Sequence, residues 1–233
     1  MDHITNRVLN DILCDLKGDN RNSVLFGTQR YLVGVGGFPG SGKSSFTKHL
    51  TDKLTSHAIS AVCVSMDGWH YTREQLSQFP DPAAAFARRG APHTFDAQEY
   101  TRFIHALKDE PRVALQAPTF SHSLKDPTPG GVQIDEHVAV VIVEGNYVLL
   151  DEERWASAAH TLDRKIWIDI DQAMTKQRLV KRHIESGICK DILEAEERAE
   201  KNDLDNGRYA RSKLVEGTDV IASVEDANFA MAQ

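Results

Sequence analysis

The chain has 233 residues, of which 41% are hydrophobic and 26% charged, a composition typical of a globular protein with a sizeable core. Its net charge of −7 argues against nucleic acid as a partner, because that needs a concentrated positive surface. We expect neither a secretory signal nor a membrane partner, because the N-terminus lacks a basic start with an apolar run and no apolar stretch approaches about 20 residues.

The first predicted elements alternate between helix and strand. Apolar residues at helical spacing predict an amphipathic helix over Ile4–Leu16, and we assign residues 1–30 to this helix and a linker. The main domain, residues 31–233, then begins with a buried strand at Tyr31–Gly36, a helix at Lys43–Ser56 and a strand at Ala61–Met66.

A long irregular stretch follows, over residues 67–95, with three prolines and a glycine. A loop of this length in a compact domain is usually functional, so we interpret about residues 68–96 as an insertion that binds a substrate. The remaining predictions are a helix at Ala97–Leu107, strands at Val113–Gln116, Val138–Val143 and Lys165–Ile170, a turn-rich segment at Asp126–Gly131, helix from Gln172 to about Lys201, and a last short strand at Asp219–Ser223.

This alternation predicts an α/β fold, a parallel sheet flanked by helices. Ligands of such folds bind beyond the carboxyl ends of the strands, so we expect the functional residues directly after each strand.

A phosphate-binding motif follows the first strand. Residues 37–44 read G-x-x-x-x-G-K-S, whose glycines let successive N–H groups point at phosphate oxygens. Lys43 is suited to the β- and γ-phosphates and Ser44 to Mg²⁺, and the strand-before-helix context disfavours a chance glycine-rich turn. We therefore predict a P-loop NTPase that binds ATP through Gly37, Pro39, Gly40, Ser41, Gly42, Lys43, Ser44 and Ser45. The motif alone does not separate kinase, GTPase and ATPase.

Two carboxylates stand at predicted strand ends. Asp67 follows the second strand and either accepts the proton of an attacking hydroxyl, holds a Mg²⁺ water, or ends the strand as a turn residue before Gly68. Glu144 ends the apolar strand Val138–Val143, the place of the second metal-associated acid of a nucleotide site. The predicted metal ligands are Ser44, Asp67 and Glu144.

Five stretches in order, GFPGSGKS, MDGWHY, RRGAPHTFD, APTFSHSLKDP and VVIVEGNYVLL, resemble the phosphoribulokinase, uridine kinase and pantothenate kinase superfamily. The similarity runs from Tyr31 to the C-terminus, and the nucleoside-kinase-like branch of bacteria and fungi is the most similar. The resemblance implies ATP-dependent phosphorylation of a hydroxyl on a nucleoside, a sugar or a pantothenate-like compound. It also implies that Asp67 is the general base or a Mg²⁺ partner and that Glu144 is the second metal-associated acid.

The resemblance further implies acceptor-side segments at Arg88–Asp96 and Phe120–His122, with His70, Arg89 and His122 as candidate substrate-binding residues. A solvated surface charge is the alternative for a loop arginine such as Arg89, and packing beside Trp69 is the alternative for His70. Trp69-His70 differs from the residues usual in uridine kinases, so the acceptor is not fixed by the resemblance.

A lid is predicted over about residues 172–210, in which the resemblance implies that Arg178 and Arg182 close on the phosphates. The two arginines are four residues apart and share one helix face, and a solvated basic face is the alternative. With Lys43 and Asp67 they are the candidate catalytic residues. Gly187 just beyond could cap this helix or serve as a hinge for closure.

The leading hypothesis is thus a small-molecule kinase with ATP and Mg²⁺, and the alternative is a nucleotide-driven ATPase or switch acting through a protein partner. Asn202–Asp205 reads N-D-L-D, which lacks the lysine of a guanine-reading motif. The histidines lack metal-site spacing, so no structural zinc is expected. Three distant cysteines favour reduced thiols in a cytoplasmic protein, with a nuclear location left open, and the oligomeric state is not predicted.

Overall fold

The computed structural model describes residues 2–18, 29–109, 111–121 and 124–223. Its centre is a five-stranded sheet with the strand order β2-β5-β1-β6-β7, in which every pair of neighbours is parallel. The strands are β1 (Tyr31–Gly37), β2 (Ala61–Ser65), β5 (Val140–Glu144), β6 (Arg164–Asp169) and β7 (Asp219–Ala222). The predicted α/β fold with a parallel sheet is confirmed, and each predicted strand of this sheet lies within two residues of the observed one.

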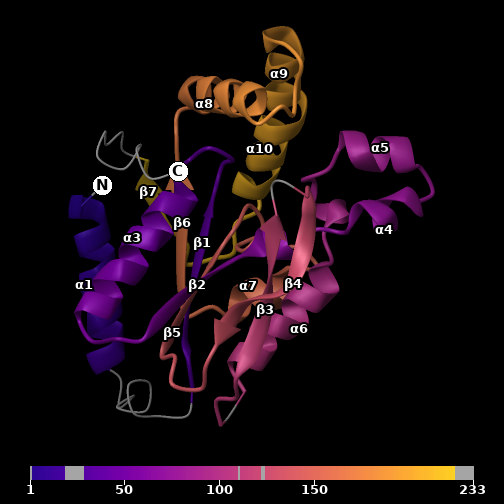
Figure 1. Ribbon diagram of the computed structural model, residues 1–233. Coiled ribbons are helices and arrows are strands. Elements are labelled where there is room, and N and C mark those ends of the chain that lie inside the picture. Colours follow the sequence, from indigo (N-terminus) through magenta and orange to yellow (C-terminus); the bar gives the residue numbers. More distant parts are fainter. Residues whose placement is uncertain (1, 19–28, 110, 122–123, 224–233) are drawn as a thin grey trace.

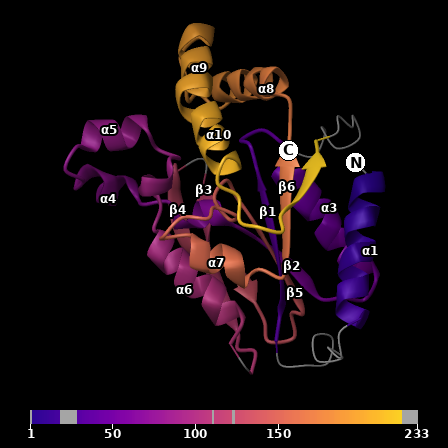
Figure 2. The same cartoon turned by 180° about the vertical axis from the view of Figure 1, so that it is seen from behind.

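Helices cover both faces of this sheet (Figures 1 and 2). On one face, α1 (Asp2–Gly18) and α3 (Lys43–Ser56) pack in a core with the buried side chains of β1. On the other face, α6 (Ala97–Leu107) and α7 (Ala156–Thr161) pack in a second core. Every residue of β1 and β5 is buried, which is why both segments read as continuous apolar or glycine runs rather than alternating ones.

The strand register brings the candidate residues together. Glu144 at the end of β5 lies opposite Val35 of β1 and opposite Ser65 of β2. The loop after β1 and the turn after β2 therefore begin beside Glu144, at the carboxyl edge of the sheet.

A second, two-stranded antiparallel sheet corrects one prediction. It joins β3 (Leu115–Ser121) to β4 (Asp126–Ile134), so the segment Asp126–Gly131, expected to be turn-rich, is strand. A strand tolerates prolines at an edge because no ladder hydrogen bond is lost there, and β4 has only β3 as a neighbour in its sheet. The hairpin pairing, which the local sequence does not encode, overrides the turn signal.

The insertion after β2 is more regular than expected. It contains two 3₁₀-helices and two short α-helices, namely η1 (Met66–Trp69), α4 (Arg73–Ser77), α5 (Pro82–Ala87) and η2 (Pro92–Thr94). Side-chain caps start the α-helices: Thr72 and Gln75 form a capping box, and the Asp81 carboxylate accepts from Ala84 N. Prolines stand in the first turns of α5 and η2, a position that helices tolerate. The prediction of an irregular segment was wrong because it treated these prolines as helix breakers.

The predicted lid is a set of helices above the carboxyl edge of the sheet (Figure 1). It comprises α8 (Gln172–Glu185), α9 (Ile192–Arg198), the π-helix η3 (Ala199–Leu204) and α10 (Asp205–Arg211). Helix continues ten residues past the expected end near Lys201. Gly187 has φ +63° and follows the last turn of α8, a position that favours glycine, so the predicted cap is confirmed. None of the helices within the described residues is long and apolar enough to cross a membrane.

Candidate active site

The phosphate loop lies between β1 and α3 and depends on its glycines. A Cβ on Gly37 would lie 2.6 Å from Ser41 Oγ and 2.8 Å from the Ile168 carbonyl oxygen, so a side chain does not fit. Gly40 and Gly42 have φ values of +80° and +90°, which turn the backbone inward. The N-terminus of α3 has no side-chain cap, and its N–H groups and positive dipole end suit an anion.

Lys43 is buried in this loop, with its ammonium group bonded to three oxygens. Lys43 Nζ donates to the carbonyl oxygens of Gly37 (3.1 Å) and Phe38 (3.0 Å) and to Asn146 Oδ1 (3.0 Å). Burial lowers the Lys43 pKa, and the charges of Glu144 and Asp67 oppose that shift. The ammonium group is thus held at the loop, where it is suited to bind phosphate oxygens.

Ser44 and Glu144 meet beside the lysine. Ser44 Oγ donates to Glu144 Oε1 at 3.2 Å, across 100 residues of sequence. Glu144 is only 8% exposed, and burial raises its pKa while the Lys43 charge lowers it. The pair places a hydroxyl and a carboxylate oxygen at the start of α3.

Asp67 stands at the end of β2, in η1. The turn is held without its carboxylate: Ser65 Oγ accepts from Asp67 N (3.3 Å), and the Asp67 carbonyl accepts from His70 N (3.2 Å). The carboxylate is 42% exposed and lies 3.9 Å from His70 Nδ1. Because the turn's hydrogen bonds do not use the side chain, the structural role considered for Asp67 is carried by its backbone.

These residues fit ATP with Mg²⁺. A nest of loop amides, a buried ammonium group and the buried Ser41 Oγ, which has no hydrogen-bond partner among the described residues, suit phosphate oxygens. Mg²⁺ prefers oxygen ligands and usually keeps one or two protein ligands beside phosphates and waters. Ser44 and Glu144 supply such oxygens, and within the described residues no three His, Cys, Asp or Glu side chains group as a dedicated metal site.

The two lid arginines differ in their surroundings. Arg178 on α8 donates to the Gly40 carbonyl oxygen at 3.1 Å, so this helix is bonded directly to the phosphate loop. Arg182, one turn later, is exposed, and its charge is among the causes that lower the Lys43 pKa. Arg178 is therefore bonded to the phosphate loop, whereas the part of Arg182 at the phosphates stays a prediction.

The candidate acceptor residues lie beyond Asp67, toward the insertion. His70 stacks between Phe95 and Phe120, at ring-centroid distances of 3.9 and 4.9 Å, and its Nδ1 lies 2.9 Å from the Asp67 carbonyl oxygen. Arg89 donates to Asp126 Oδ1 (3.0 Å) and to the Tyr71 carbonyl oxygen (2.9 Å). His122, the third candidate, lies outside the described residues.

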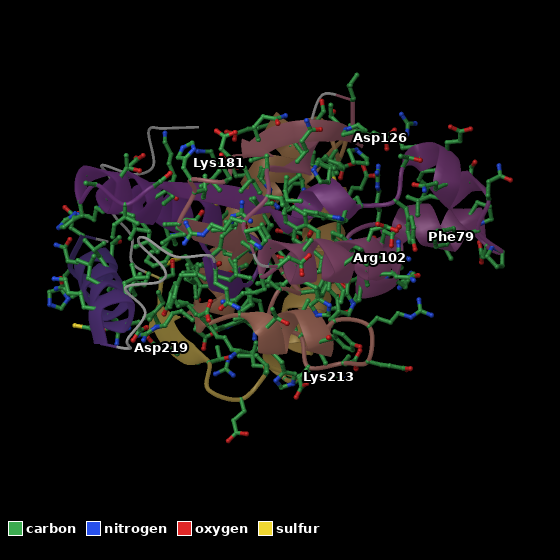
Figure 3. All side chains as sticks on the ribbon, turned by 90° about the horizontal axis from the view of Figure 1, so that it is seen from below. Phe79, Arg102, Asp126, Lys181, Lys213 and Asp219 are labelled. Atoms are coloured by element: carbon green, nitrogen blue, oxygen red, sulfur yellow. The ribbon has the colours of Figure 1, made fainter. Side chains whose placement is uncertain are left out.

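Arg89 thus joins the insertion to the β3–β4 hairpin. Figure 3 shows Asp126 on the side of the hairpin that faces the insertion, whose position Phe79 marks. Arg89 is only 15% exposed, and its guanidinium group also lies 5.5 Å from the centroid of the Phe120 ring. These contacts stabilise the packing of the insertion against the hairpin, and this role does not depend on whether Arg89 also binds a substrate.

We expect Arg89→Ala to lower the free energy of unfolding by about 1.5–3 kcal/mol, because it leaves the half-buried Asp126 carboxylate without its cation. Denaturant unfolding measures this change. Arg102→Ala is the matched control, since the Arg102–Glu99 pair is exposed and worth about 1 kcal/mol or less. Equal stability of the two variants would contradict the structural part assigned to Arg89.

Two groups of site residues escaped the sequence interpretation. Asn146, two residues after Glu144, bonds the Lys43 ammonium group, and only its position after a strand end hinted at this. The lid also contacts the insertion: Asn202 Nδ2 donates to the Arg89 carbonyl oxygen at 3.1 Å, and Arg88 donates to Asn206 Oδ1 at 3.3 Å. No local pattern signals these bonds, because they join segments more than 100 residues apart.

Comparison with known proteins decides the family. The model of the phosphoribulokinase/uridine kinase family matches residues 32–222. The chain belongs to this family. A protein of Schizosaccharomyces pombe named "Putative uridine kinase C227.14" is 34% identical over 189 residues, which are 80% of this chain and 80% of that protein.

Solved structures of kinases have the same fold as this chain. The ATP-dependent kinase YFH7 of Saccharomyces cerevisiae superposes with a TM-score of 0.82 at 25% identity, over 95% of this chain and 99% of that one. A "putative fructose transport system kinase" from Silicibacter sp. TM1040 superposes with a TM-score of 0.75 at 31% identity, over 83% of this chain and 90% of that one. With its family and its P-loop fold, this chain is an ATP-dependent small-molecule kinase, as the sequence predicted.

Proposed function

We propose that this kinase transfers the γ-phosphoryl group of ATP, with Mg²⁺, to a hydroxyl of a nucleoside, a sugar or a pantothenate-like metabolite. The observation that carries the proposal is the convergence of Lys43, the Ser44–Glu144 pair and Asp67 at the carboxyl ends of three neighbouring strands. The family membership supports the reaction class, and the names of relatives that refer to uridine and fructose support an acceptor of this size.

Each residue has a distinct part in the proposed reaction. Lys43 neutralises charge on the β- and γ-phosphates, and the N–H groups of residues 37–45 hold the phosphate oxygens. Ser44 and Glu144 hold Mg²⁺, which when bound neutralises phosphate charge, with Asp67 as a further ligand or a ligand to its water. Asp67 also accepts the proton of the attacking hydroxyl, for which its exposed carboxylate is accessible.

We propose the following division of residues 31–233. The segment of about residues 68–96 binds the acceptor through His70 and Arg89, and His122 is a further acceptor-binding residue. The lid of about residues 172–210 places Arg178 and Arg182 at the phosphates. Two hydrogen bonds join the two segments, from Asn202 Nδ2 to the Arg89 carbonyl oxygen and from Arg88 to Asn206 Oδ1.

A screen for phosphorylated products tests the proposal. The full chain is incubated with ATP, Mg²⁺ and a panel of nucleosides, sugars and pantothenate-like compounds, and products are identified by mass spectrometry. We expect slow ADP release without an acceptor and faster release with a phosphorylated product when the right acceptor is present. Rapid ADP release that no acceptor stimulates would instead support an ATPase or switch.

The lid arginines give a kinetic prediction. Arg178→Lys and Arg182→Lys keep the charge but lose the planar, bidentate hydrogen bonding that suits a phosphoryl group. We expect each variant to lower kcat by roughly tenfold, with a smaller change in ATP affinity, because the interaction strengthens in the transition state. Steady-state kinetics with saturating acceptor measure kcat, and equilibrium binding measures the ATP affinity.

Lys181→Arg is the matched control for this prediction. Lys181 lies on the same helix, its side chain is 76% exposed, and it pairs with Glu185 rather than facing the phosphate loop. If both arginine variants turn over like the control, the basic face is solvated surface and the phosphates are held elsewhere.

A further inference from the structure

The ammonium group of Lys43 has a full set of hydrogen-bond partners within the protein. A lysine ammonium has three donors and no acceptor, and all three donors of Lys43 have partners: two loop carbonyl oxygens and Asn146 Oδ1. ATP can bind Lys43 only if phosphate oxygens replace at least one of these partners. The strength of each partner therefore affects how tightly ATP binds.

Asn146 is the partner that comes from outside the phosphate loop. Its backbone is fixed on both sides. Gly145 N donates to the Val35 carbonyl oxygen at 3.1 Å, and a Cβ on Gly145 would lie 2.5 Å from Met66 Cβ, so this segment packs tightly. Tyr147 is fully buried and donates to the Gly90 carbonyl oxygen at 2.7 Å.

The orientation of the Asn146 amide follows from its partner. Because an ammonium group only donates, the atom facing Lys43 Nζ is the amide oxygen, and the amide nitrogen faces away. Lys43 thus meets a neutral acceptor here, although Glu144 lies two residues earlier and both Glu144 and Asp67 act on the Lys43 pKa. Both carboxylates act on the cation through their charge, whereas the side chain bonded directly to it is a neutral amide.

We propose that Asn146 is a positioning residue that holds Lys43 through a neutral oxygen, in the place that an oxygen of the β- or γ-phosphate takes when ATP binds. A phosphate oxygen carries negative charge and so adds a Coulomb attraction to the Lys43 ammonium group that the neutral amide oxygen lacks. A phosphate oxygen therefore displaces the amide oxygen readily, whereas a carboxylate at this position would compete with it. This inference deepens the proposed function and rests on it, since it assigns Lys43 to the nucleotide phosphates.

Asn146→Asp provides the test, because the substitution changes charge and hardly changes shape. ATP and AMP affinities are measured by isothermal titration calorimetry on the full chain in EDTA, so that a new carboxylate cannot gain affinity through Mg²⁺. We expect Asn146→Asp to weaken ATP binding by about tenfold or more, and AMP binding by less than about twofold, since AMP has no β- or γ-phosphate. Asn10→Asp on the exposed face of α1 is the matched control and should bind both nucleotides like the wild type.

The same substitution in a Lys43→Ala chain distinguishes two effects: competition of the new carboxylate with ATP for Lys43, and direct repulsion of the phosphates by that carboxylate. In a Lys43→Ala chain, we expect Asn146→Asp to weaken ATP binding by less than about twofold further, because the competing ion pair no longer exists. An equal loss in both backgrounds would mean that the carboxylate repels the phosphates directly, which would overturn the proposal. Unchanged ATP affinity of a folded Asn146→Asp protein would overturn it too.

Asn146→Ala keeps the proposal testable if the aspartate variant does not fold. It removes the competing oxygen, so ATP should bind at least as tightly as to the wild type, with a lower kcat because Lys43 is less well oriented. A loss of ATP affinity greater than about threefold would show that Asn146 contacts the nucleotide itself and is not a placeholder. A wild-type chain that binds no ATP would instead contradict the proposed function, so the two failures are distinguishable.

Discussion

Lys43→Ala is expected to leave the protein folded and to lower kcat/KM by roughly 10²–10³-fold, because the site loses the buried cation that neutralises the β- and γ-phosphates. Burial of the ammonium group is itself unfavourable, as the direction of its pKa shift indicates, so its removal offsets part of the cost of leaving Glu144 and three acceptor oxygens without their partner. Burial raises the pKa of Glu144 and the Lys43 charge lowers it, so the substitution removes the influence that favours the charged carboxylate.

Kinetics with saturating acceptor and thermal unfolding measure the two parts of this prediction. Lys48→Ala is the matched control, since Lys48 lies on the same helix and is exposed. Near wild-type turnover by a folded Lys43→Ala protein would contradict the part assigned to the lysine. A large fall in melting temperature would show that its three hydrogen bonds hold the loop together, and that loss of activity alone says little about catalysis.

Asp67→Asn is expected to lower kcat by ~10²–10⁴-fold, the usual effect of losing a general base, while ATP binding and thermal stability change little. An amide has nearly the shape of the carboxylate but cannot accept the proton of the attacking hydroxyl. Stability should hold because the turn at Asp67 is fixed by its own backbone and by Ser65 Oγ.

Asp81→Asn is a suitable control for this second prediction, because Asp81 caps α5 from an exposed position and asparagine caps a helix equally well. Unchanged kcat together with reduced stability in Asp67→Asn would identify Asp67 as a structural turn residue. Unchanged kcat with weaker Mg²⁺ dependence would leave Asp67 as a metal partner and place the general base elsewhere.

The local signals of the sequence were strong where an element carries its own pattern. The helix at Lys43–Ser56 follows a glycine-rich motif, the helix at Ala97–Leu107 has a clear apolar face, and both were predicted with their observed bounds. The continuous apolar run before Glu144 indicated a strand, and the structure places it as β5 between β2 and β1. The prolines and capping residues between positions 72 and 92 were weaker signals of helix, and the short helices α4 and α5 were not predicted.

Contacts between distant segments could not be predicted in the same way. The strand at Asp126–Ile134 depends on pairing with β3, and the bonds of Arg89 depend on where that hairpin lies. The sequence showed only that Asn146 follows a strand end, and the fold places its Oδ1 3.0 Å from Lys43 Nζ. A residue's partners across more than 100 positions follow from the order of strands in the sheet, which local periodicity does not encode.

The sequence by itself determined the phosphate-binding motif, the carboxylates at the strand ends, the parallel α/β fold and the kinase family. These follow from short-range requirements: glycines where the backbone must turn around phosphates, and apolar runs where strands are buried on both faces. Only the tertiary structure decided that Ser44 meets Glu144, that Asn146 bonds Lys43, and that Arg89 joins the insertion to the hairpin. The physical reason is that parallel strands adjacent in the sheet are distant in the chain, so the site forms only when their carboxyl ends align.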